Sequence, residues 1–216
     1  MLTNIINNLG SNPTSLFPDA VRIGLIAAAS TIIVHLLLNV FFGSAKLRRP
    51  RWALLTKLIY LGTVFSVGVL AVTSFYSVLS HGAMHGWFLL LHVMAAGMFV
   101  GVLMCMAIMW AAACRFGNTQ NATSQSTSTS LNSKAGEVDY ESLPGERFTG
   151  LTKFAFWLIL ISGIVTAGTM LLSMLPLFGT DEMQDLITAH RYAGLLLVIA
   201  TMFHAYLAIM ARFRRV

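Results

Sequence analysis

Apolar residues gather in five long runs along the chain, and polar residues fill the stretches between them. The runs cover roughly residues 20–42, 57–79, 86–113, 152–176 and 186–211. Each run is close to the length of about 20 apolar residues that an α-helix needs to cross a bilayer. No Asp or Glu lies within any run. The pattern therefore predicts an all-α fold, an integral membrane bundle of five transmembrane helices.

The composition agrees with this pattern. Of the 216 residues, 56% are hydrophobic and only 10% are charged, a balance far from that of soluble domains. Residues 1–19 lack the basic start and short apolar stretch of a cleavable signal, so we expect a polar N-terminal segment and a retained first helix. Lipid is therefore an expected partner of the chain.

Basic residues mark one side of the predicted membrane. They fall between the first and second runs, between the third and fourth, and at the C-terminus, and comprise Lys46, Arg48, Arg49, Arg51, Lys57, Arg115, Lys134, Arg147, Lys153, Arg212, Arg214 and Arg215. Only Arg22 and Arg191 fall on the other side. The positive-inside rule then predicts a multi-pass protein of the cytoplasmic membrane with its N-terminus outside and its C-terminus in the cytoplasm. Charges confined to helix ends argue against a nucleic-acid partner.

The long connection at residues 116–150 is rich in Ser, Thr, Asn and Gln, and predicts a disordered cytoplasmic loop. We expect this loop to interrupt a four-helix bundle at residues 57–213, to which the segment 20–42 adds one further helix. Cys105 and Cys114 are not part of a Cys-x-x-Cys-His motif, so we interpret them as apolar core thiols.

Four of the six histidines lie within predicted helices, where ligating groups are costly and therefore functional candidates. His190 and His204 are 14 residues apart, so both rings leave the last helix on one face, about 21 Å apart along its axis. Counted from the helix ends, His92 matches the depth of His190 near the outer face. His35 matches the depth of His204 near the cytoplasmic face.

A haem b is held by two histidines of equal depth on facing helices. We therefore predict one or two haems b, with His92 and His190 as ligands of an outer haem and His35 and His204 as ligands of an inner one. A single membrane histidine is as often a helix–helix hydrogen bonder, and this alternative stays open for His35.

Small and charged residues accompany these ligands. Gly97 and Gly101 form a Gly-x-x-x-Gly pair, and Gly194 follows His190 by four residues, so helices or a macrocycle can approach closely there. Helix packing without a cofactor explains the glycine pair equally well. Arg191 is placed to pair with a haem propionate, and extension to lipid headgroups is its alternative role.

His81 and His85 lie at the outer turn between the second and third runs. We favour solvated side chains there. A surface metal site, or ligation of a haem in place of His92, are the alternatives.

The carboxyl-terminal half carries an ordered set of motifs: Lys153-Phe154-Ala155-Phe156-Trp157, Ser162-Gly163 and His190-x13-His204-x-Tyr206. Weaker ones are Leu70-Ala71-Val72-Thr73 and Gly86-Trp87-Phe88-Leu89-Leu90-Leu91-His92. With these motifs, about residues 50–213 resemble the four-helix cytochrome b subunits of respiratory formate dehydrogenases and nickel-iron hydrogenases. The resemblance implies His92 and His190 as the ligands of one haem, and His204 as one ligand of the other.

The chain departs from this family at two places. The family's first-helix ligand corresponds to Tyr60, so the inner haem is lost, is ligated by Tyr60, or is ligated by His35 from the additional helix. We prefer His35. The family's quinone site adjoins an Asn-x-Gly-Gln-Lys run, of which only Lys153 remains. The resemblance thus implies a quinone that hydrogen-bonds to Lys153 and His204.

Together these features predict a membrane-anchored b-type cytochrome without a catalytic domain of its own. It would pass electrons between a redox partner subunit or c-type cytochrome at the outer face and the quinone pool or another acceptor. We expect the partner to dock near the acidic loop residues Asp181, Glu182 and Asp185. The alternative is a cofactor-free transporter or assembly scaffold whose histidines join helices or relay protons.

Overall fold

The apolar runs fold into long α-helices in the computed structural model, which describes residues 13–42, 54–80, 84–111, 114 and 150–213. The described residues form α2 (Pro13–Phe42), α3 (Leu54–Ser80), α4 (Gly86–Trp110), α6 (Gly150–Ser173) and α7 (Thr180–Phe213). All five helices are long and apolar enough to cross a membrane. The predicted all-α fold with five membrane-spanning helices is confirmed for this part of the chain.

Some helices extend beyond the apolar runs that predict them. The α7 helix begins at Thr180 rather than near residue 186, because its first turn contains Asp181 and Glu182, which the positive end of the helix dipole stabilises. The α2 helix begins at Pro13, where proline is tolerated because a first-turn N–H has no acceptor within the helix. Two predicted segments lie largely outside the described residues. They are the polar N-terminal segment, of which residues 1–12 are not described, and the long loop, which falls within residues 115–149 except for its last residue.

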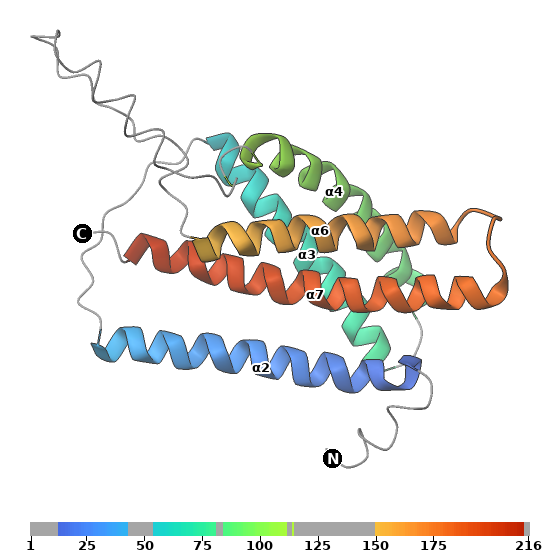
Figure 1. Ribbon diagram of the computed structural model, residues 1–216, viewed down its shortest axis with the longest axis horizontal. Coiled ribbons are helices and arrows are strands. Elements are labelled where there is room, and N and C mark those ends of the chain that lie inside the picture. Colours follow the sequence, from blue (N-terminus) through green and yellow to red (C-terminus); the bar gives the residue numbers. More distant parts are fainter. Residues whose placement is uncertain (1–12, 43–53, 81–83, 112–113, 115–149, 214–216) are drawn as a thin grey trace, which may run out of the picture.

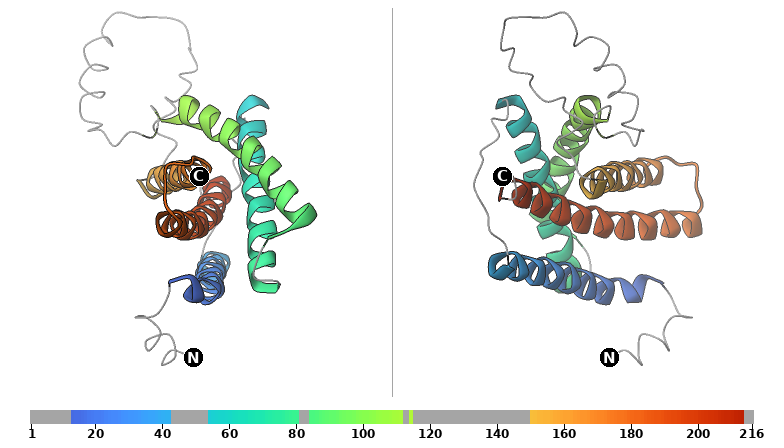
Figure 2. Two further views of the ribbon diagram at one scale, coloured as in Figure 1. Left: turned by 90° about the vertical axis from the view of Figure 1, so that its right-hand side faces the viewer. Right: turned by 60° about the vertical axis from the view of Figure 1, so that its left-hand side comes forward.

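The helices are arranged as two antiparallel pairs and one added helix. The α6 and α7 helices lie side by side, and α2 runs along α7 on the side away from α6 (Figure 1). The α3 and α4 helices pack against each other and cross the α6–α7 pair obliquely, as a separate layer (Figure 2). Residues from the C-terminal parts of α3 and α6 and from the N-terminal parts of α4 and α7 line one common cavity at this crossing.

Two groups of buried side chains join these helices. One lies within the four-helix part and includes Val67, Phe99, Leu103, Phe156 and Leu197. The other joins α2 to α3 and α7, and consists of Phe17, Val21, Phe75 and Leu195. The additional N-terminal helix is therefore packed onto the bundle through buried apolar contacts.

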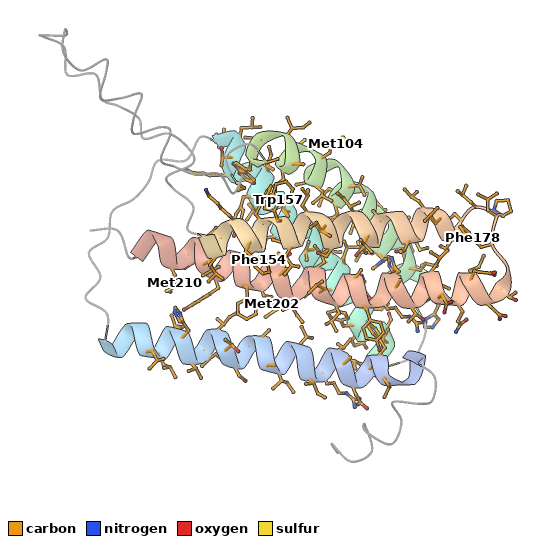
Figure 3. The ribbon with its side chains drawn as sticks, in the orientation of Figure 1. Met104, Phe154, Trp157, Phe178, Met202 and Met210 are labelled. Carbon is orange, nitrogen blue, oxygen red and sulfur yellow. The ribbon has the colours of Figure 1, made fainter. Side chains whose placement is uncertain are left out.

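Much of the remaining surface is apolar. Among the exposed side chains, Met104 of α4 has 63% of its surface exposed and Phe154 of α6 has 58%, and both are labelled in Figure 3. Large apolar side chains on every helix share this exposure. Such a surface would be unfavourable in water, and it fits contact with the hydrocarbon of lipid.

Candidate functional site

A cavity of about 760 Å³ lies between α3, α4, α6 and α7, where the two helix pairs cross. Its walls are almost entirely apolar, and the side chains that carry a polar or charged group include His92, His190 and Arg191. Small-molecule and cofactor sites have volumes of about 300–1,000 Å³ and are mostly apolar with a few placed polar groups. We call the half of the bundle that contains this cavity the cavity half.

The His92 side chain of α4 is held by a hydroxyl from the neighbouring helix. His92 Nδ1 lies 3.0 Å from Thr73 Oγ1 of α3. The Thr73 hydroxyl donates its own proton to the backbone, with Val69 O at 2.8 Å and Leu70 O at 3.1 Å. Since that proton is already used, Thr73 accepts from His92 Nδ1–H, and we assign Nε2 of His92 as the unprotonated nitrogen.

The His190 side chain of α7 is held by a main-chain carbonyl. Its Nδ1 lies 2.8 Å from Thr166 O of α6. A carbonyl oxygen can only accept, so Nδ1 of His190 carries a proton and Nε2 is the nitrogen that does not take part in this hydrogen bond. Both histidines therefore line one cavity with Nδ1–H bonded to oxygen, and Nε2 of each ring is the nitrogen that remains for a metal. This is the state in which histidine ligates a metal through Nε2.

Of the three glycines predicted near the ligands, two line the cavity. Gly97 and Gly194 are among its lining residues. A Cβ atom placed on Gly97 would meet nothing within 4 Å, and one on Gly194 only Thr166 Cγ2 at 4.0 Å. Gly101 lies one turn beyond Gly97 on α4 and is exposed, with no atom within 4 Å of a Cβ placed there.

Arg191 contributes a positive charge to the cavity wall. Its guanidinium carbon lies 5.9 Å from the centroid of the Phe17 ring, and Phe17 is a buried residue of α2. Phe17 also packs edge-on against Tyr192, with ring centroids 5.4 Å apart. The additional helix α2 thus touches the residue that the sequence singled out as an anion partner.

The other predicted ligand pair lies in the opposite half of the bundle, and its two members have different neighbours. His204 is buried, and its ring lies 5.8 Å from that of Tyr60 between centroids. His35 forms a hydrogen bond with Tyr206. Residues 204 and 206 leave α7 about 200° apart, so His35 approaches a different face of α7 from the one that carries His204. The depths of His35 and His204 are similar, but their rings contact different partners, Tyr206 and Tyr60.

Lys153, the remaining residue of the predicted quinone site, is half-buried in the first turn of α6. It lies near Cys114, whose backbone oxygen accepts a 3.0 Å hydrogen bond from Trp157 Nε1. Burial raises the pKa of the Cys114 thiol, and the charge of Lys153 opposes this in part. Cys114 is fully buried and Cys105 is exposed, so only one of the two cysteines lies in the core as expected.

The outer-turn histidines do not contribute to the cavity as far as the structure describes them. His85 is exposed and precedes α4, and it is not a lining residue, while His81 lies outside the described residues. No group of three or more His, Cys, Asp or Glu side chains comes together among the described residues. A metal held here by His92 and His190 would therefore need further ligands from its own cofactor.

Thr73, Thr166 and Phe17 are site residues that the sequence analysis did not identify. Thr and Ser in apolar helices commonly bond to the carbonyl one turn earlier, so their presence alone does not indicate a site. The signal for Thr73 would have been its depth, because it lies on α3 opposite His92. Comparison with protein-family models, curated proteins and solved structures finds no match to this chain.

Proposed function

We propose that this chain is a membrane-anchored b-type cytochrome that holds a haem b between His92 and His190 and transfers electrons across part of the membrane. The observation that carries the proposal is the pair of histidines, on α4 and α7, that line one apolar cavity with Nδ1 of each bonded to an oxygen of a neighbouring helix. A haem iron takes four ligands from its macrocycle and two from the protein, so two histidines are sufficient.

The residues around the cavity fit such a group. Its volume of about 760 Å³ is within the range of cofactor sites. The open space at Gly97 leaves room for a flat macrocycle close to the helix backbone. Arg191 offers a positive charge for a propionate, and the walls are mostly apolar. When bound, a haem supplies reversible one-electron chemistry, while the chain orients the ligands and sets their basicity.

We place the electron donor, a redox partner subunit or c-type cytochrome, at the α6–α7 turn. Asp181, Glu182 and Asp185 lie there on exposed positions, and Phe178 is at the tip of the hairpin (Figure 3). The cavity-lining residues Leu186 and Ile187 follow directly along α7, so this surface is close to the proposed haem. On the opposite half, Lys153 and His204 are the residues that we propose for contact with a quinone or another acceptor.

The number of haems depends on the opposite half. His204 contacts Tyr60, and His35 is bonded to Tyr206, so a second haem would require these aromatic contacts to rearrange. We therefore propose one haem, in the cavity half.

The same aromatic contacts favour a second candidate function. A cofactor-free transporter or assembly scaffold would use histidines to join helices, as His35 and Tyr206 join α2 and α7. This candidate predicts that no haem binds to the purified chain.

A visible difference spectrum with a haem count tests the proposal. The full chain is expressed with added haem precursor, purified in detergent, and measured as dithionite-reduced minus oxidised. We expect low-spin b-type bands and one haem per chain. H92A and H190A should each lose the haem, and the control H85A, which removes an exposed histidine outside the cavity, should keep it. A wild-type chain without haem would overturn the proposal in favour of the cofactor-free candidate.

A further inference from the structure

We infer that Thr73 is a positioning residue that sets the electron-donating strength of His92 and thereby the reduction potential of the haem. The inference rests on the proposed function, because it concerns the same cavity. It extends that function to a side chain that does not itself line the cavity. Thr73 acts only through its hydrogen bond to His92 Nδ1, at 3.0 Å.

The direction of the hydrogen bonds makes Thr73 an acceptor toward His92. Its hydroxyl proton points to carbonyls of its own helix, with Val69 O at 2.8 Å and Leu70 O at 3.1 Å. A hydroxyl whose proton is donated in this way presents a lone pair to its other neighbour. Donation to a carbonyl also makes that lone pair a better acceptor, because hydrogen bonds in a chain polarise one another.

The surroundings shield this hydrogen bond from water and hold its two partners in place. Thr73 has only 2% of its surface exposed, so water does not compete for its oxygen. It is anchored to α3, which packs along α4, the helix that carries His92. The ring of His92 is thus held at a fixed orientation toward the cavity.

The two proposed ligands differ in whether a substitution can remove the acceptor of their Nδ1–H hydrogen bond. His190 Nδ1–H donates to Thr166 O, a main-chain atom that no side-chain substitution removes. His92 Nδ1–H donates to the Thr73 side-chain oxygen, which a single substitution removes, although the ring of His92 also interacts with the backbone of Leu70. When the ring nitrogen that does not bind the metal donates a hydrogen bond, the imidazole becomes more basic and the reduction potential of the metal changes. Thr73 is therefore a position at which a side-chain substitution can change the hydrogen bond to a proposed ligand, and with it the haem potential.

The test is a redox titration of the haem in a series of Thr73 variants of the full chain. Thr73→Ser keeps the hydroxyl acceptor, Thr73→Cys replaces it with the weaker sulfur acceptor, and Thr73→Val removes it. A stronger acceptor increases donation from His92 and favours the ferric state. The midpoint potential should therefore rise in the order Thr or Ser, then Cys, then Val. The g values of the ferric low-spin signal should shift in the same order.

The matched control is Thr63→Val on the same helix. Thr63 is also buried and also donates to the carbonyl one turn earlier, Ile59 O at 2.9 Å, but it does not line the cavity or contact His92. Its variant should leave the potential and the g values unchanged. An equal shift in Thr63→Val and Thr73→Val would overturn the inference.

The outcomes separate this inference from the proposed function. A wild-type chain that binds haem, with equal potentials in the Ser and Cys variants, overturns the role of Thr73 and leaves the cytochrome intact. A wild-type chain without haem overturns both. If Thr73→Val fails to fold, the nearly isosteric Ser and Cys variants still decide the result, because they differ chiefly in the acceptor atom.

Discussion

Arg191 is the residue through which charge acts on the proposed haem. It lines the cavity, and its guanidinium lies over the ring of Phe17. No ion pair to Arg191 occurs among the residues that the structure describes, where Asp19 pairs with Arg22. A half-buried cation without a carboxylate beside it is suited to an anionic group of a ligand, such as a propionate.

We expect Arg191→Gln to weaken haem retention and to lower the midpoint potential. A hydrogen bond to a charged group contributes about 1.5–3 kcal/mol, so haem loss should be about 10-fold or more faster. The potential falls because a nearby positive charge favours the reduced state, which carries one more electron. Haem transfer to an acceptor protein and a redox titration measure the two effects.

One control keeps the positive charge at residue 191, and the other removes a positive charge at a different position. Arg191→Lys retains the charge, so the midpoint potential of the haem should stay close to the wild-type value. Arg22→Gln removes an exposed charge on α2 that lies outside the cavity, and should change neither measurement. A lower potential in Arg22→Gln of the same size would show that net charge, rather than the position of Arg191, is responsible.

Residue types and depths in the sequence predict a pairing of His92 with His190, and the pairing as ligands stays a prediction. His92 and His190 were paired by counting from the helix ends, and the structure brings them to one cavity. Their hydrogen-bond acceptors could not be predicted in the same way. Thr73 and Thr166 contribute a side-chain and a main-chain oxygen, and which oxygen faces a ring depends on how each helix is rotated about its axis.

At the scale of helices, Gly163 allows α6 to approach α4 closely. A Cβ atom placed on Gly163 would lie 2.9 Å from Leu103 Cδ2 and 3.0 Å from Phe99 Cζ. Gly163→Ala should therefore destabilise the bundle by about 1–3 kcal/mol, the usual cost of overpacking. Thermal unfolding in detergent, followed by circular dichroism, measures the change.

Gly168, five residues further along α6, provides the comparison for Gly163. A Cβ atom there meets nothing within 4 Å, so Gly168→Ala should be neutral or stabilise the helix by up to about 1 kcal/mol. Equal effects at the two positions would contradict the close contact between α4 and α6.

The α2 and α7 helices are joined by the hydrogen bond between His35 and Tyr206. We expect His35→Leu and Tyr206→Phe to destabilise the chain by similar amounts, and the double variant to cost little more than either one. Hydrogen bonds between membrane helices contribute about 0.6 kcal/mol on average and up to about 1.7 kcal/mol, which sets the size of the coupling. A double-mutant cycle of unfolding free energies measures it.

The haem count of the His35→Leu variant gives the second measurement. Since His35 is bonded to Tyr206, we expect the count to stay at the wild-type value. Loss of one haem from a wild-type total of two would show instead that His35 is a ligand, as the sequence pairing with His204 predicts.

The apolar runs predicted the existence and order of the helices, because length and hydropathy alone decide whether a segment can span a bilayer. They did not predict how α2 is rotated. His35 lies at the depth of His204, yet it meets Tyr206, because α2 packs on α7 through a buried apolar cluster that includes Val21 and Leu195. Depth follows from residue count within one helix, whereas the facing side depends on packing between helices.

At the scale of the whole molecule, the cavity half is the part of the bundle in which the predicted helices and the predicted ligand pair lie together. Hydropathy predicts the bundle, and the resemblance to cytochrome b subunits pairs His92 with His190. The structure supplies the cavity and the hydrogen bonds that hold both rings. The family itself stays a prediction, since the comparisons find no match, and the departure at Tyr60 falls in the half where the ring of Tyr60 packs on that of His204.

The direction of the chain across the membrane decides which side the cavity half faces. Basic residues concentrate between α2 and α3, between α4 and α6, and after α7, so we expect these segments in the cytoplasm. Reporter fusions to the full chain measure this. Green fluorescent protein at the C-terminus should fluoresce and alkaline phosphatase there should be inactive, whereas phosphatase inserted at the α6–α7 turn should be active. The reverse result would turn the acidic turn and the cavity half toward the cytoplasm, and the electron donor would then have to be a cytoplasmic partner.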